Sequence, residues 1–330
     1  MADVLLQIEQ LTTQFRTERG IFPAISNLSL TVNKGEIVCI VGESGSGKTV
    51  ASLSVMQLLP PAGSIASGEI RFEGRNLLAL DQKELRKIRG RSIAMIFQDP
   101  MMALDPVYPC GEQIMEAIRI HTRTSRKEQR ARALELLEQV GIPHPERVMK
   151  AYPHELSGGM CQRVVIAMAL ACNPKLLIAD EPTTALDVTV QAQILELLKK
   201  IRREFGMSIL MITHDLGVVA EMADRVAVMY AGQVVEEGEV RSIFHHPRHP
   251  YTQGLIRSIP HLDKPSDKLY SIPGTVPGIA AMPSGCRFHP RCPECMAICE
   301  REEPKPVATS PTGSVRCWLA DKPKQNGAET

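Results

Sequence analysis

The chain has 330 residues, 44% of them hydrophobic, and its 38 lysines and arginines nearly balance 37 aspartates and glutamates. This length supports one large domain and a smaller appendage, and the balanced charge does not indicate a basic face for nucleic acid. The N-terminal sequence MADVLLQIEQL lacks the basic start and apolar core of a secretion signal. Because no segment approaches the roughly 20 apolar residues that cross a bilayer, we expect a protein that is not secreted and does not span a membrane.

The first half of the chain predicts strands followed by helices. Residues 4–41 alternate between apolar and polar positions and include the β-branched runs LSLTV and EIVCIV, which indicates strands. VASLSVMQLL predicts a helix that is ended by Pro60-Pro61. SGEIRFEG then indicates a strand and a turn, and RSIAMIFQDP a strand that ends in a loop. Residues 101–155 favour helices, among them the amphipathic RKEQRARALELLEQVG, which is closed by Gly141.

The second half predicts buried strands and then a different kind of segment. KLLIADEP and SILMITHD are apolar runs that end in polar residues, typical of parallel strands whose C-terminal ends carry chemistry. RVAVMYAGQVVEEG predicts a hairpin that turns at Ala231-Gly232. Beyond about residue 260 prolines and glycines multiply, and we expect a linker or a loosely structured appendage there.

The sequence GESGSGKT contains every residue of the phosphate-loop pattern G-x-x-x-x-G-K-[ST]. Its glycines let backbone N–H groups curl around a phosphate, Lys48 brings positive charge to the outer phosphates, and Thr49 offers a hydroxyl to Mg²⁺. A predicted strand before the loop and a helix after it disfavour a glycine-rich turn that binds nothing. We expect a nucleoside triphosphate to be bound by the whole loop, which consists of Gly42, Glu43, Ser44, Gly45, Ser46, Gly47, Lys48 and Thr49.

Further polar residues end the predicted strands. We expect Asp180 to reach Mg²⁺ through water and Glu181 to polarise an attacking water. A solvated acidic turn is the alternative, but it is disfavoured because the pair ends a strand in a chain that already has a phosphate loop. His214 ends another strand at the edge beside the nucleotide crevice, and Gln98 is placed to contact both Mg²⁺ and the water.

A second anion-binding position is predicted at the start of a long apolar helix. Ser157, Gly158 and Gly159 in LSGGM offer bare backbone there, and a helix N-terminus suits an anion. The alternative is an ordinary helix cap, in which Ser157 bonds to the first helical turn.

The phosphate loop, Gln98, LSGGM, LLIADEP, TALD and THD occur in the order and approximate spacing of ABC-type ATPases, which the chain resembles from about residue 4 to 260. The resemblance implies an α/β fold of the P-loop NTPase class, with a RecA-like core, an antiparallel β-subdomain and a helical insert at about 99–160. It divides the chain into a nucleotide-binding domain, 1–260, and a small cysteine-rich C-terminal extension, 261–330. It also implies that two such domains pair head to tail, so that Ser157–Gly159 of one chain cap the ATP on the other's phosphate loop.

The same resemblance implies roles for single residues. Glu181 would be the general base, His214 the switch residue that contacts the γ-phosphate, and Asp187 part of the loop that communicates across the dimer. Phe15 falls where an aromatic residue stacks on adenine, with Phe22 as the competitor. In the signature motif Met160 replaces the commoner glutamine, while Gln162 and Arg163 keep the rest.

Five of the nine cysteines crowd into the tail, and in a chain without an export signal such a cluster indicates metal ligation before disulfides. Cys286, Cys292, Cys299 and Cys317 have the spacing C-x5-C-x6-C-x17-C, and four thiolates can hold a [4Fe–4S] cluster or a zinc ion. Reduced, unligated thiols are the third possibility. The tail and HHPRHPYTQGL resemble the extension of ABC ATPases from oligopeptide/dipeptide and nickel importers, in which an iron–sulfur cluster is associated with this arrangement. The resemblance favours [4Fe–4S] over zinc, and Cys295 does not match the pattern.

The resemblance implies an ATP-hydrolysing subunit that energises a membrane importer of di- or oligopeptides, with nickel as the alternative solute. Its implied partners are a second ABC ATPase chain, more often different than identical, two transmembrane permeases and an extracytoplasmic solute-binding protein. Its implied place is the cytoplasmic face of the inner membrane. A soluble ABC ATPase acting on nucleic acid or ribosomes is disfavoured because the sequence has neither a long coiled-coil insert nor a second ATPase domain. A non-catalytic scaffold is disfavoured because Glu181 and His214 are both intact.

Overall fold

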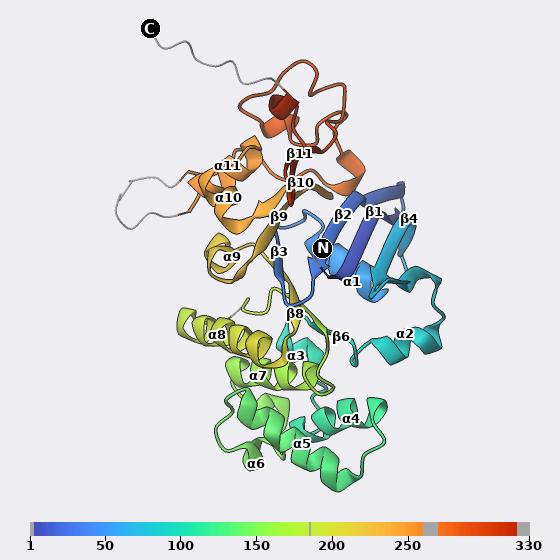
Figure 1. The fold of residues 1–330 in the computed structure, drawn as a ribbon, viewed down its shortest axis with the longest axis vertical. Helices are drawn as coiled ribbons and strands as arrows, with labels where there is room; N and C mark the ends of the chain where they lie inside the picture. The colour runs from blue at the N-terminus through green and yellow to red at the C-terminus, as the bar shows by residue number, and fades with distance from the viewer. Residues whose placement is uncertain (1–2, 185, 260–269, 322–330) are drawn as a thin grey trace. The chain divides into compact units, whose positions relative to one another are not determined.

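The computed structural model describes residues 3–184, 186–259 and 270–321 (Figure 1). The chain forms two compact units, and each unit takes segments from several parts of the sequence. Unit 1 consists of Met1–Gln7, Thr31–Ile37 and Ile70–Thr213, and unit 2 consists of Ile8–Leu30, Val38–Glu69 and His214–Thr330. Among the described residues, no helix is long and apolar enough to cross a membrane.

Three buried parallel strands form the centre of unit 1. β7 (Leu176–Asp180) pairs with β6 (Ile93–Ile96) on one side and with β8 (Ser208–Thr213) on the other. Every residue of β7 and β8 is buried, because both strands are continuous apolar runs. The strands predicted from KLLIADEP and SILMITHD are therefore confirmed, and their carboxyl ends meet at one edge of the sheet.

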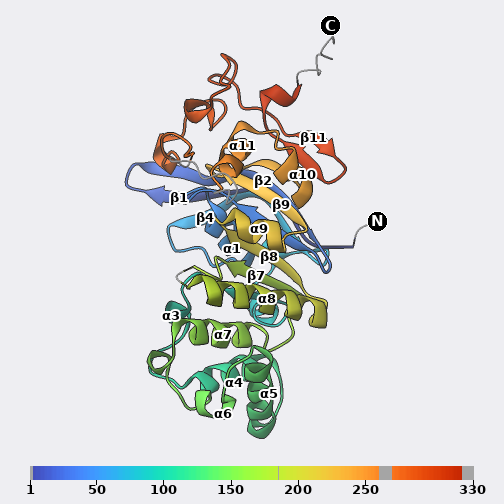
Figure 2. The same ribbon diagram turned by 90° about the vertical axis from the view of Figure 1, so that its left-hand side faces the viewer.

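The helices of unit 1 confirm the prediction for residues 101–155. α4, α5 and α7 contact one another, and α6 contacts α5 (Figures 1 and 2). α5 begins at a capping box between Ser125 and Glu128 and closes before Gly141, whose φ of 75° favours glycine. The helices are α2 (Gln82–Ile88), α3 (Pro100–Ala103), α4 (Cys110–His121), α5 (Arg126–Gln139), α6 (Pro145–Val148), α7 (Gly158–Ala169) and α8 (Val188–Phe205), with 3₁₀ turns at η1 (Leu77–Ala79) and η2 (Pro153–Glu155).

Unit 2 is built around the pairing of β3 (Ile37–Val41) with β9 (Arg225–Tyr230), which run in parallel. β10 (Gln233–Glu239) returns antiparallel to β9. The hairpin turns at Ala231 and Gly232 as predicted, and both residues have positive φ, 46° and 84°, as a two-residue turn of type I′ requires.

The helices of unit 2 are α1 (Lys48–Met56), α9 (Leu216–Met222), α10 (Val240–His245) and α11 (Pro250–Arg257). The prediction that α1 runs up to Pro60 is wrong. Gln57 adopts a left-handed conformation with φ 48°, and its N–H bonds to the carbonyl oxygens of Leu53 and Ser54. The helix is thus closed by its own backbone before the prolines are reached.

Long strands confirm the prediction for residues 4–41. β1 (Val4–Thr17), β2 (Gly20–Asn33), β4 (Gly63–Phe72) and β5 (Arg75–Asn76) form a four-stranded sheet in the order β2-β1-β4-β5. Apolar residues of β1 and β2 are buried at alternating positions over much of their length, which matches the period-2 pattern of the sequence.

The prediction of a loosely structured appendage is wrong for residues 270–321. β12 (Gly313–Val315) pairs with β10 and with β11 (Val307–Ser310), and 3₁₀ turns form at η3 (Ile279–Ala281), η4 (His289–Arg291) and η5 (Trp318–Asp321). Phe288 is 2% exposed and packs against Tyr230 and Tyr251. The predicted domain boundary between residues 260 and 261 lies outside the described residues.

Candidate nucleotide site

The phosphate loop connects β3 to α1 in unit 2, and its glycines are required by geometry. Gly45 and Gly47 have φ values of 80° and 101°, which glycine adopts at little cost. A Cβ on Gly42 would lie 2.1 Å from the carbonyl oxygen of Met229. A residue with a side chain at position 42 would therefore push the loop off β9.

Lys48 is drawn into the phosphate loop. The residue is only 5% exposed. Its Nζ donates to the carbonyl oxygens of Gly42 at 2.7 Å and Glu43 at 3.0 Å. Ser44, Gly45 and Thr49 are exposed. The loop thus combines a fixed ammonium group with exposed backbone, the combination that cradles a phosphate.

The acidic pair of unit 1 lies where β7 ends. Asp180 is the last residue of β7 and is 2% exposed. Glu181 follows in a left-handed conformation with φ 47°, and its N–H donates to the Ile212 carbonyl oxygen at 2.8 Å. Such a conformation costs a non-glycine residue about 1–3 kcal/mol and is often found at functional sites.

Two donors converge on one oxygen of the Glu181 carboxylate. Gln98 Nε2 donates to Glu181 Oε2 at 3.2 Å, and Thr184 Oγ1 donates to the same oxygen at 2.8 Å. The structure therefore brings together Gln98 and Glu181, both predicted from strand ends, and adds the hydroxyl of Thr184, a residue of TALD to which the sequence assigned no role. A carboxylate fixed in this way can accept a proton from water held beside it.

The signature residues begin helix α7 in unit 1. Ser157 is the N-cap, and its Oγ accepts the N–H of Met160 at 3.4 Å, which is the capping alternative. A Cβ on Gly159 would lie 2.8 Å from Val190 Cγ1, so glycine is needed there for close packing. Ser157 and Gly158 are exposed, and their predicted contact with a second chain's ATP stays a prediction.

The other predicted residues lie at element ends or in strands. Asp187 caps α8 by accepting the Val190 N–H at 2.9 Å. His214 is exposed directly after β8. Phe15 and Phe22 are both half-buried in β1 and β2, so their burial does not separate the two candidates for adenine stacking.

Four of the tail cysteines converge on one small cavity. Its volume is about 10 Å³, and it is lined by Cys286, Cys292, Cys299 and Cys317, while Cys295 is exposed and does not line it. Burial is the main cause that raises the pKa of Cys286 to about 11 and that of Cys292 to about 12. Among the described residues no group of three or more His, Cys, Asp or Glu is placed to hold a metal ion. Four thiols are a suitable donor set for an iron–sulfur cluster or zinc. The distances between them in this structure, however, do not form a metal site.

Comparison with known proteins supplies the family. The model of the ABC transporter family matches residues 25–184, and that of the oligopeptide/dipeptide transporter C-terminal region matches residues 235–299. The oligopeptide transport ATP-binding protein AppD of Bacillus subtilis (strain 168) is 51% identical over 326 residues, which cover 98% of each chain. The chain belongs to the ATP-binding proteins of ABC transporters. This ABC ATPase is also 52% identical over 300 residues to the dipeptide transport ATP-binding protein DppD of Escherichia coli (strain K12), which covers 91% of this chain and 92% of that one.

Solved ABC structures share the fold. The dimeric post-hydrolysis state of the ATP-binding cassette MJ0796, bound to ADP and Pi, has a TM-score of 0.65 and 33% identity, covering 72% of this chain and 99% of that one. For cbiO1 from Clostridium perfringens, part of the cbiONQ complex, the TM-score is 0.63 and the identity 29%, covering 74% and 92%. The predicted ABC-type P-loop NTPase fold of the α/β class is thus confirmed, as is the assignment of this chain as an ABC ATPase.

Proposed function

We propose that this ABC ATPase energises the import of di- or oligopeptides. The observation that carries the proposal is the identity of about half over nearly the whole length with two proteins named for oligopeptide and dipeptide transport. The match of residues 235–299 to the oligopeptide/dipeptide transporter C-terminal region favours peptides over nickel as the solute. Uptake of labelled dipeptides by cells that depend on this chain tests the proposal, and uptake of nickel in place of peptides would overturn it.

Within the site we propose that Glu181 is the general base and that Lys48, with the other residues of 42–49, holds the phosphates. The two hydrogen bonds to Glu181 support its role, because a fixed carboxylate is poised for one proton transfer. His214 would contact the γ-phosphate. Phe15 would stack on adenine.

We propose that Mg²⁺ takes oxygen ligands from three residues, one in unit 2 and two in unit 1. They are Thr49, Gln98 and Asp180, and hydroxyl, amide and carboxylate oxygens are the donors this ion prefers. When bound, Mg²⁺ would neutralise charge on the β- and γ-phosphates. In unit 1, Asp180 is deeply buried. A buried carboxylate is costly unless it is paired or binds a metal ion, which fits a role as a Mg²⁺ ligand.

We further propose that two ATPase chains pair head to tail, so that Ser157–Gly159 and Asp187 of one chain face the ATP of the other. A solved relative is described as a dimer. A different ABC ATPase chain is the preferred partner, and an identical chain is the alternative.

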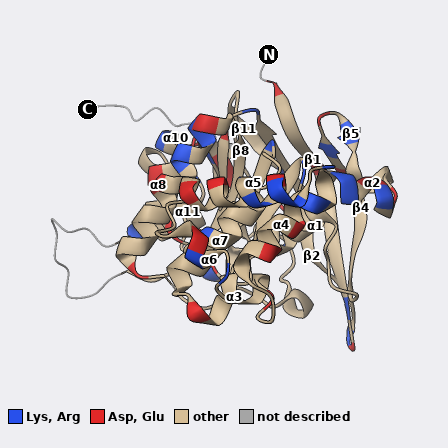
Figure 3. Cartoon of the chain, turned by 90° about the horizontal axis from the view of Figure 1, so that it is seen from below, with Lys and Arg blue, Asp and Glu red and all other residues tan. Residues whose placement is uncertain are grey.

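The region after β6 supports a docking surface for transmembrane permeases. Large apolar side chains are exposed there, Phe97 by 40%, Met101 by 46%, Met102 by 85%, Val107 by 70% and Tyr108 by 56%. A hollow of about 530 Å³ between α4 and α5 is lined in part by Tyr108. Figure 3 shows both basic and acidic residues on α5, so this helix does not present the purely basic face that favours nucleic acid.

Membrane retention tests this docking surface. Met102→Glu should release the chain from membranes, whereas Ile21→Glu, at another exposed apolar residue (54%), should leave it bound. Affinity purification from membranes should recover a second ATPase chain, two permeases and a solute-binding protein. Retention on the cytoplasmic face that persists without permeases, or recovery of ribosomes instead, would contradict the proposal.

For the cysteine tail we propose a [4Fe–4S] cluster, with zinc as the runner-up. The convergence of the four cysteines on one cavity supports it. Metal binding would require the cavity walls to move and the thiols to lose their protons, so it should weaken as the pH falls. Protein purified without oxygen should carry iron and colour, which Cys299→Ser should lose and Cys295→Ser should keep. Colourless wild-type protein would overturn the iron proposal, and metal analysis would then test zinc.

A further inference from the structure

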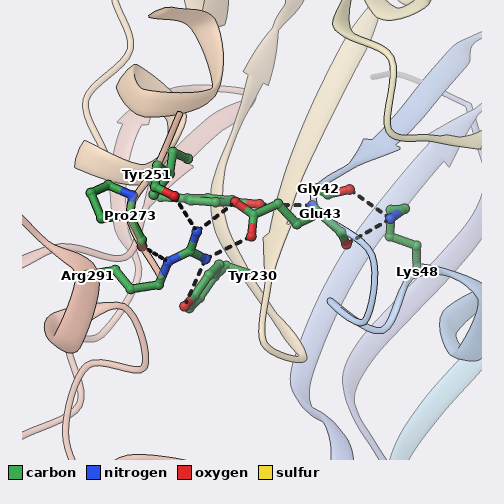
Figure 4. A network of polar contacts seen from close by, with 8 residues as sticks. Gly42, Glu43, Lys48, Tyr230, Tyr251, Pro273 and Arg291 are labelled. Atoms are coloured by element: carbon green, nitrogen blue, oxygen red, sulfur yellow. Dashed lines mark hydrogen bonds and ion pairs between the residues drawn. The ribbon is translucent and has the colours of Figure 1, made fainter. Parts of the chain in front are cut away.

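The C-terminal segment of unit 2 makes a direct ion pair with the phosphate loop. Arg291 in η4 and Glu43 are 248 positions apart, yet Nη1 of the arginine lies 2.8 Å from Oε2 of the glutamate and Nη2 lies 3.1 Å from Oε1 (Figure 4). Two parallel bonds between a guanidinium and a carboxylate fix orientation as well as distance. The loop is therefore held by a residue that no phosphate-loop motif contains.

The arginine is anchored before it reaches the loop. Its side chain is 6% exposed, its Nε donates to the Pro273 carbonyl oxygen at 2.7 Å, and its Nη2 donates to that of Ile272 at 3.3 Å. The Tyr230 ring lies 5.7 Å from the guanidinium carbon. Burial would lower the pKa of Arg291, but hydrogen bonds to Glu43 and Tyr230 raise it, and it ends above its ordinary value. This is a pre-positioned charge and not a flexible surface salt bridge, which would contribute little.

Glu43 also contacts the phosphate-loop lysine, so it links Arg291 to Lys48. Its N–H donates to Tyr251 Oη at 2.9 Å, and its carbonyl oxygen accepts from Lys48 Nζ at 3.0 Å (Figure 4). Tyr251 is fully buried and packs against Tyr230 and Phe288. A single residue of the loop thus connects the C-terminal segment to the ammonium group that faces the phosphates.

A second arginine of the same segment supports the other side of the loop. Arg287 donates to Ser26 Oγ at 2.7 Å and to the Ala231 carbonyl oxygen. The next residue, Gly232, donates its N–H to the Ser46 carbonyl oxygen at 2.8 Å. The sequence RFHPR between Cys286 and Cys292 therefore contacts both the first half of the phosphate loop and the turn that bonds to its second half.

We propose that Arg291 is a positioning residue for ATP binding, which acts by fixing Glu43 and through it the phosphate loop. Without the guanidinium, the half-buried carboxylate of Glu43 would remain uncompensated next to a site for a triphosphate, and the loop would lose one of its anchors. The proposal rests on the proposed role of this loop in ATP binding. Lys48→Ala tests that role separately, because it should abolish ATP binding whatever Arg291 does.

The test is the Kd for MgATP of the full chain carrying Arg291→Met, Glu43→Gln or both. Arg291→Met should weaken binding about tenfold and Glu43→Gln by less, and the double variant should bind no more weakly than Arg291→Met, since both changes act through one contact. Wild-type affinity in Arg291→Met would overturn the proposal. The proposal would also be overturned if the losses of affinity in the two single variants simply added in the double variant.

Arg316→Met is the matched control. Arg316 lies in the same C-terminal segment, its side chain is 12% exposed, and it pairs with Glu303 at 3.1 Å instead of with the loop. This variant should bind MgATP like the wild type. If it weakens binding as much as Arg291→Met, the effect is a general loss of folding in the segment and the proposal fails.

Two further measurements cover the case in which Arg291→Met does not fold. Arg291→Lys keeps the charge but loses the two-pronged geometry, and it should weaken MgATP binding about threefold; wild-type affinity would contradict the proposal. By reciprocity of linked equilibria, MgATP should also slow proteolysis of residues 270–321 in the wild type, and should slow it less in Arg291→Lys. Equal protection of both would contradict it as well.

Discussion

At the scale of single residues, the most constrained group is the Glu181 carboxylate. Its backbone has a positive φ of 47°, its N–H bonds to the neighbouring strand, and one carboxylate oxygen accepts from both Gln98 and Thr184. Backbone strain at a residue held by several hydrogen bonds is expected where position matters more than stability. The geometry therefore fits the general base better than a solvated acidic turn.

Glu181→Gln should lower the rate of ATP hydrolysis at least a hundredfold and leave ATP binding intact, because it removes a proton acceptor and keeps the shape. Phosphate release and equilibrium nucleotide binding measure the two effects. Thr184→Val, which removes one donor to the carboxylate, should reduce the rate by about tenfold. Full-rate hydrolysis by Glu181→Gln would assign the base to another residue.

Residues that belong to short motifs could be predicted from the sequence, and residues that act through distant contacts could not. The phosphate loop and the carboxylates at the strand ends lie in short sequence patterns, and the chemistry of these patterns follows from neighbouring residues alone. Thr184 lies in TALD, but that motif gave no indication that its hydroxyl donates to Glu181, and Arg291 lies in no motif. Arg291 meets Glu43 only because the fold brings together positions 248 residues apart.

At the scale of elements, the start of α7 depends on close packing against α8. A methyl group at Gly159 would lie 2.8 Å from Val190 Cγ1, whereas one at Gly158 would come no closer than 3.8 Å to Leu186. The first contact is shorter than side chains tolerate and the second is ordinary van der Waals contact. The two glycines therefore have different structural roles.

Gly159→Ala should lower the free energy of unfolding by about 1–3 kcal/mol through overpacking. Gly158→Ala should leave stability within about 0.5 kcal/mol of the wild type. Chemical denaturation of both variants measures the difference. Equal stabilities would show that α8 yields at this contact.

The types of the elements could be predicted from periodicity, but the end of α1 and the ordered structure of residues 270–321 could not. α1 ends at Met56 because Gln57 adopts a left-handed backbone conformation. This conformation could not be predicted, because glutamine rarely adopts it. Residues 270–321 are rich in proline and glycine, which suggested loose structure, yet β12 pairs with β10 and Phe288 is buried. Long-range strand pairing and ring packing cannot be deduced from local composition.

At the scale of the whole molecule, we propose that two chains complete each catalytic pocket. Phosphoryl transfer depends on positioning and charge neutralisation, so a phosphate loop without a signature motif over it should be a poor catalyst.

The isolated monomer should therefore bind ATP but hydrolyse it slowly. Its rate per chain should rise when the second ATPase chain is added. Hydrolysis measured at concentrations where light scattering shows only monomer tests this expectation. Full-rate turnover by a strictly monomeric sample would contradict it.

The Ser157→Arg variant, measured both alone and in the assembled transporter, tests whether two chains complete each pocket. We expect an unchanged Kd for MgATP in the isolated chain, because the variant's own phosphate loop is intact, and a loss of at least a hundredfold in ATP hydrolysis by the complex. Ser125→Arg, which removes the helix cap of α5, controls for the loss of a cap. Weakened ATP binding by the isolated Ser157→Arg chain, or full hydrolysis by the complex, would contradict the head-to-tail pairing.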